Sequence, residues 1–82
     1  MINPIRQWKK DNPQKTYHEM ANNIGLTYGT VSNFSCYPPH KFHGMDIIKV
    51  ILFKDHYGID IEKYIRDGME EANKEEKLIE II

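Results

Sequence analysis

The sequence contains one cysteine among its 82 residues, and no long apolar run. A single cysteine cannot form an intrachain disulfide, which favours a reducing compartment, and we expect the cytoplasm. The longest apolar run, Val50–Phe53, is far shorter than the roughly 20 residues that span a bilayer. The first ten residues lack the apolar stretch of a secretory signal. We therefore expect neither a membrane protein nor a secreted one.

Patterns typical of catalysis and of β-strands are also missing. No glycine-rich phosphate loop, carboxylate pair or Ser/His/Asp arrangement occurs. Cys36, His40 and His43 have the side-chain types of zinc ligands, but a fourth ligand is lacking and a solvated loop is the preferred interpretation. Useful period-2 alternation is absent, which argues against a sheet. We expect a protein that is not an enzyme and that binds no cofactor and no metal.

The charge of the chain is distributed unevenly. The net charge is −1 overall, but residues 1–43 carry five basic and two acidic side chains, a net charge of +3, and the rest carries −4. Three of the four histidines also lie in the first part. This asymmetry favours one surface for an anionic partner and a separate acidic segment.

Capping residues divide the first part of the chain into short helices. Asn3 is a suitable N-cap for a first helix, and Asn12-Pro13 ends it because the residue before a proline is disfavoured in helical geometry. Thr16 begins a second helix with a capping-box sequence, and Gly25 ends it as a C′ glycine. Thr27 begins a third helix only two residues later. The residues expected to be buried in the second and third helices are Met20, Ala21, Ile24, Val31 and Phe34.

Two further helices are predicted after a loop. Residues 47–57 are apolar on almost all sides, so we expect this helix to be the central element of the core. Gly58 ends it, and Asp60 caps a fifth helix.

Two short helices joined by a tight glycine turn predict a helix-turn-helix between Thr16 and Cys36. The third helix has a polar arc opposite its buried edge, and this arc contains no carboxylate. A surface without negative charge is suited to a groove that is lined by phosphates. The residues of this arc are Tyr28, Gly29, Ser32, Asn33 and Cys36.

The pattern Met20-Ala21-x-x-Ile24-Gly25-Leu26-Thr27-x-x-Thr30-Val31-Ser32-x-Phe34 resembles the helix-turn-helix of lambda-repressor-like proteins, the Cro/repressor or XRE type. That family has a small residue at the position of Ala21, glycine at Gly25 and a β-branched residue at Val31. The resemblance covers about residues 3–66. It implies an all-α, compact five-helix lambda-repressor-like domain, here followed by a C-terminal helical extension.

The resemblance also implies DNA contacts on the third helix and at the start of the second. The implied base contacts are Thr27, Tyr28, Ser32 and Asn33, of which the asparagine amide pairs well with adenine. The implied phosphate contacts are Arg6, Lys9, Lys10, Thr16, Tyr17 and Lys41. The family usually carries Gln, Arg or Lys on the recognition arc, whereas this chain has Gly29 and no basic residue there.

We therefore expect a small transcriptional regulator of bacterial or phage type that binds double-stranded DNA in a sequence-specific way. The alternative is a protein-interaction module on the same scaffold, such as an antirepressor that binds a regulatory protein. Residues 1–66 are interpreted as the DNA-binding domain, and residues 67–82 as an acidic and apolar extension that favours a homodimer. The apolar residues of the extension are Met69, Ala72, Leu78, Ile79, Ile81 and Ile82.

Overall fold

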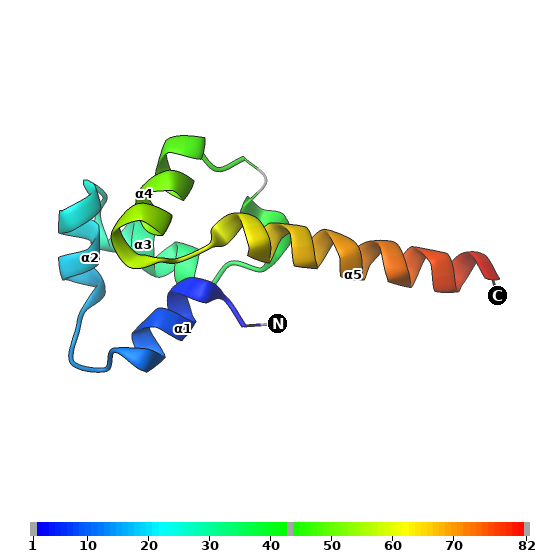
Figure 1. Cartoon of the computed structure of the whole chain (residues 1–82), viewed down its shortest axis with the longest axis horizontal. Coiled ribbons are helices and arrows are strands. Elements are labelled where there is room, and N and C mark those ends of the chain that lie inside the picture. Colours follow the sequence, from blue (N-terminus) through cyan, green and yellow to red (C-terminus); the bar gives the residue numbers. More distant parts are fainter. Residues whose placement is uncertain (1, 43, 82) are drawn as a thin grey trace.

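A computed structural model describes residues 2–42 and 44–81, with side chains up to Ala72. The described chain is all-helical, as expected, and contains no strand. Figure 1 shows a compact body from which the last helix extends to one side. The elements are α1 (Pro4–Asp11), α2 (Tyr17–Ile24), α3 (Tyr28–Ser35), the 3₁₀ helix η1 (Pro39–Phe42), α4 (Ile47–Tyr57) and α5 (Ile61–Ile81). In this described part, no helix is both long and apolar enough to cross a membrane.

The predicted capping residues define the helix ends. The side-chain oxygen of Thr16 accepts a hydrogen bond from the backbone N–H of Glu19 at 3.2 Å, and Thr27 caps α3 in the same way. Gly25 and Gly58 have φ angles of 74° and 66°, a left-handed conformation that favours glycine after a helix. The short connection between α2 and α3 therefore follows from local sequence signals.

The core lies where α1, α2, α3 and η1 meet α4 and the first turns of α5. The predicted buried residues of α2 and α3 are in it, except that Phe34 is only half-buried. Phe42 of η1 is also fully in the core, although the segment after α3 was predicted to be a loop. The buried apolar residues are Ile5, Met20, Ala21, Ile24, Val31, Phe42, Phe53, Ile59, Ile61 and Tyr64.

The prediction that α4 is the central element of the core is wrong. Phe53 is its only fully buried residue, whereas Ile47, Ile48 and Ile51 are exposed by 66%, 61% and 49%. α4 lies at the outside of the body and packs against α2 and α5, which leaves one face uncovered (Figure 1). When apolar residues occur on all sides of a helix, the sequence does not show which side packs against the rest of the chain.

Asn3 connects α1 to the end of α3. Its side-chain oxygen accepts hydrogen bonds from the backbone N–H groups of Ile5 and Arg6, as predicted for an N-cap. Its Nδ2 also donates to the carbonyl oxygens of Phe34 and Tyr37 at 2.8 and 2.9 Å. The Tyr64 hydroxyl donates to the same Tyr37 carbonyl at 3.1 Å, and burial raises the pKa of Tyr64 above its ordinary value.

α5 is continuous across residues 66 and 67. Its first half packs on η1, and at Gly68 an added Cβ would lie 2.7 Å from Pro39 Cγ and still nearer to Pro39 Cβ. The side chains of Leu78, Ile79, Ile81 and Ile82, which belong to the predicted dimerisation segment, lie outside the described residues.

Candidate nucleic-acid interface

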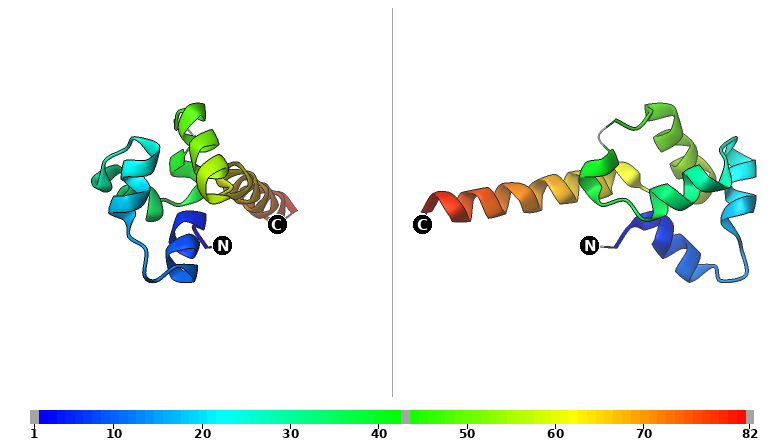
Figure 2. Two further views of the ribbon diagram at one scale, coloured as in Figure 1. Left: turned by 60° about the vertical axis from the view of Figure 1, so that its left-hand side comes forward. Right: turned by 180° about the vertical axis from the view of Figure 1, so that it is seen from behind.

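The exposed face of α3 is a stripe of small and polar residues. Seen from behind the view of Figure 1, α3 lies on the near side of the body (Figure 2, right). Asn33 is exposed, and its side chain makes no hydrogen bond with the described residues. Gly29 is exposed as well, with nothing within 4 Å of the position that a Cβ would occupy. Ser32 is half-buried at the edge of the stripe.

At the N-terminal end of α3, side chains of α2 and α3 form the stripe together. The ring of Tyr28 stacks on the ring of His18, with a centroid separation of 4.1 Å and an interplanar angle of 12°. This stack holds the start of α2, where Thr16 is the N-cap, beside the start of α3. Thr27 Oγ1 is already engaged with Thr30, through the backbone N–H at 3.2 Å and the hydroxyl at 2.8 Å. The rings of Tyr28 and His18 therefore form one aromatic stack that joins the starts of α2 and α3.

The other end of the stripe is basic. Cys36, the exposed C-cap residue of α3, accepts a contact from Arg6 Nη2 at 3.6 Å. Lys41 of η1 lies over the ring of Tyr37, with its Nζ 5.7 Å from the ring centroid. Two of the predicted phosphate contacts thus lie close to the C-terminal end of α3, although they come from other elements.

The remaining predicted phosphate contacts are placed differently. Lys9 is half-buried and its Nζ donates to the carbonyl oxygen of Pro13 at 3.1 Å, in the loop between α1 and α2. Lys10 is exposed on α1. Tyr17 is half-buried and packs against the core. Lys9 and Tyr17 are thus partly engaged in the fold itself.

Sequence reasoning did not find two features of this surface. His18 was not among the predicted contact residues, yet its ring stacks on that of Tyr28 from the neighbouring helix. The contact between Arg6 and Cys36 joins residues 30 positions apart, and no local pattern encodes it. The available signal for His18 is its position in the first turn of the second helix, which a helix-turn-helix holds next to the start of the third.

No metal site is present in the part of the chain that the structure describes, since no three His, Cys, Asp or Glu side chains are grouped there. His43, the last residue of the Cys36–His40–His43 spacing, is outside that part.

Comparison of the chain with protein families, curated proteins and solved structures found no match.

Proposed function

We propose that the chain binds double-stranded DNA in a sequence-specific way, as a small transcriptional regulator whose α3 enters the major groove. The observation that carries the proposal is the exposed face of α3, which has no carboxylate and has basic side chains at one end. The major groove accommodates an α-helix, and it presents donors and acceptors that distinguish all four base pairs. The resemblance of residues 20–34 to repressor helix-turn-helix sequences supports the same function.

In this proposal Asn33 reads a base and the surrounding residues position α3. A side-chain amide can pair bidentately with N6 and N7 of adenine. Gly29 lets the backbone of α3 approach the floor or wall of the groove, and Tyr28 contacts the DNA with its ring held by His18. Ser32 and Thr27 lie at the margins of the contact. The N-cap end of α2, Arg6, Lys10 and Lys41 bind phosphates.

The acting form in this proposal is a homodimer. A single module reads only a few base pairs, and two-fold pairing doubles the contacts with a palindromic site.

Selection from random duplexes, followed by binding measurements on the selected site, tests the proposal. Asn33→Ala should weaken binding to the selected site by about 1–3 kcal/mol and relax the preference at one base pair. Lys10→Ala is the matched control, because a phosphate contact weakens binding to all sequences by a similar factor. If the two variants give the same pattern, α3 does not read bases. If no duplex is bound even at low salt, the DNA-binding proposal is wrong.

A protein-interaction module is the second candidate, and the exposed isoleucines of α4 favour it. Large apolar side chains at Ile47, Ile48 and Ile51 are suited to a protein surface rather than to DNA. Under this candidate, a regulatory protein would bind the chain, and the Asn33→Ala substitution would leave that binding unchanged.

A further inference from the structure

Two stacked aromatic rings lie on the outside of the fold, where α2 and α3 begin. The rings of Tyr28 and His18 have centroids 4.1 Å apart and are within 12° of parallel. Both residues are exposed, and Tyr28 keeps 47% of its surface accessible. The core between the two helices is made by buried side chains such as Ile24 and Val31. The stack therefore lies outside this core, and part of the tyrosine side chain stays available to a binding partner.

His18 restricts the ring of Tyr28 before a partner binds. Stacking of two aromatic rings is favourable in itself, so Tyr28 has fewer conformations to lose when it contacts a ligand. Ordering a side chain on binding otherwise opposes the affinity. The His18 ring makes no hydrogen bond with the described residues, and stacking is the interaction that fixes the two rings. The pair is thus a preorganised contact surface.

Tyr28 is the residue at this end of α3 whose side chain is free to contact a base. Thr27 uses its hydroxyl within the chain, in hydrogen bonds with Thr30, and Gly29 has no side chain. The ring of Tyr28 is apolar apart from its hydroxyl group. The 5-methyl group of thymine is the apolar feature that distinguishes the edges of base pairs in the major groove. The tyrosine ring therefore matches this methyl group in polarity.

The spacing along α3 predicts where that thymine lies. Asn33 follows Tyr28 by five positions in the same helix, which corresponds to a rise of about 7.5 Å. Successive bases of one DNA strand are about 3.4 Å apart. When α3 lies along the major groove, the tyrosine ring therefore meets a base pair about two steps from the adenine that Asn33 reads.

We propose that Tyr28 reads the 5-methyl group of a thymine, and that His18 holds the tyrosine ring in the orientation for this contact. The inference rests on the proposed binding of DNA, and it specifies a chemical group that the bound sequence must contain. Tyr28 is the contact residue, whereas His18 is a positioning residue on the neighbouring helix. Transfer of one methyl group from water to an apolar surface changes a binding constant about fourfold.

Replacement of thymine by uracil in the selected duplex tests the contact. Uracil lacks only the 5-methyl group, so each thymine is replaced in turn while base pairing is retained. At one position, the replacement should weaken binding of the wild-type chain by about three- to fivefold. Tyr28→Ala should bind the thymine and uracil duplexes equally at this position, whereas Tyr28→Phe should keep the discrimination because it keeps the ring. If Tyr28→Phe binds the two duplexes equally, the hydroxyl and not the ring makes the contact, and the proposal is wrong.

Substitutions of His18 test the positioning role. His18→Ala should lower the discrimination between thymine and uracil to less than about twofold, because the unstacked tyrosine ring samples other orientations. His18→Phe should restore the discrimination, since a phenyl ring can also stack on Tyr28. Asn22→Ala is the matched control, because Asn22 is exposed on α2 and lines the same shallow hollow as both rings but takes no part in the stack. Unchanged discrimination in His18→Ala would overturn the positioning role.

Proton NMR of the chain without DNA tests the stack itself. The ring protons of His18 lie beside the face of the Tyr28 ring, so its ring current should shift their resonances upfield. The shift should disappear in Tyr28→Ala while the helical circular dichroism is retained. Identical histidine resonances in the two proteins would show that the stack does not form, and the proposal would be wrong.

The duplex measurements also separate this inference from the proposed function. If duplexes are bound in a sequence-specific way but no effect of uracil depends on Tyr28, the methyl contact is wrong and the proposed binding of DNA stands. If no duplex is bound even at low salt, both proposals are wrong.

Discussion

Asn3 bonds to two helices with the two ends of one side-chain amide. The oxygen caps α1, and the nitrogen satisfies the carbonyl oxygens of Phe34 and Tyr37 where α3 ends. Asn3 is 7% exposed, so a lost partner would leave these carbonyls poorly hydrated. Because an unsatisfied buried polar group costs about 1–3 kcal/mol, this residue contributes more to stability than a surface cap does.

Two substitutions separate the two roles of Asn3. Asn3→Ala removes both, and the free energy of unfolding should fall by about 2–4 kcal/mol. Asn3→Asp retains the cap oxygen but sets a carboxylate against two carbonyl oxygens, so its loss should be comparable. Urea denaturation measures both values. If Asn3→Asp is as stable as the wild type, the hydrogen bonds from Nδ2 make no net contribution.

At the scale of single residues, the features that depend on local geometry, such as helix caps, could be predicted from the sequence. The N-caps Asn3, Thr16 and Thr27 and the glycine at 25 follow from groups within a few positions along the chain. The second role of Asn3 could not be predicted, because its acceptors lie 31 and 34 positions away. The stack of His18 on Tyr28 depends in the same way on how α2 packs against α3.

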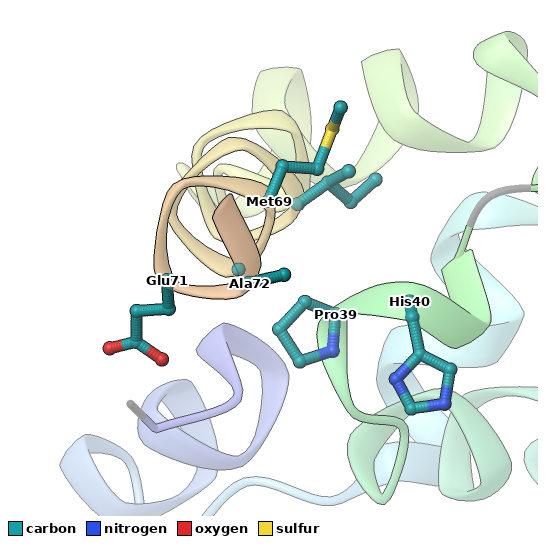
Figure 3. A pocket seen from close by; sticks show the side chains of 7 residues that line it. Pro39, His40, Met69, Glu71 and Ala72 are labelled. Carbon is teal, nitrogen blue, oxygen red and sulfur yellow. The ribbon is translucent and has the colours of Figure 1, made fainter. Parts of the chain in front are cut away.

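Among the elements, α5 and η1 lie close together (Figure 3) at Gly68 and Pro39, where an added Cβ on the glycine would meet the proline ring. Proline is rigid, so Pro39 cannot move away from an added methyl group as a flexible side chain would. The glycine is therefore required by the partner element and not by the backbone angles of α5.

A pair of glycine substitutions tests this account. Gly68→Ala should lower the free energy of unfolding by about 1–2 kcal/mol, because overpacking outweighs the better helix propensity of alanine. Gly29→Ala is the control, since its Cβ meets nothing within 4 Å, and it should raise stability by up to about 1 kcal/mol. Thermal unfolding followed by circular dichroism compares them. Stabilisation by both substitutions would show that α5 is not held this closely to η1.

The elements themselves were predicted better than their packing. All five α-helices follow from capping signals and apolar spacing, whereas η1 and the burial of Phe42 were missed. A 3₁₀ helix of four residues is too short to produce a periodic pattern that can be detected in a sequence. The prediction for α4 was wrong because an apolar helix has the same sequence pattern whether its own chain or a partner covers it.

For the whole molecule, the uneven distribution of charge predicts how the proposed binding of DNA should respond to salt. Residues 1–43 have a net charge of +3, whereas the acidic stretch 70–80 lies on the helix that extends from the body. Four to six phosphate contacts per copy should give a slope of log K against log salt of about −4 to −5, roughly doubled in a dimer. Lys41→Ala should reduce the slope by about 1 per copy, and Glu70→Gln should leave it unchanged. Binding that does not depend on salt would contradict phosphate contacts by these residues.

The packing of Trp8 has a spectroscopic consequence. Trp8 is the single tryptophan of the chain, and its ring meets that of Tyr57 edge-on, with centroids 5.2 Å apart. The phenol oxygen of Tyr57 in turn accepts a hydrogen bond from Asn23 at 2.9 Å, so α1, α2 and α4 meet around one fluorophore. Trp8 lies on α1 and is not part of the exposed stripe of α3. Its emission therefore reports whether the helical body is assembled, and titrations with DNA or with a second copy can be followed while this internal signal verifies that the fold is intact.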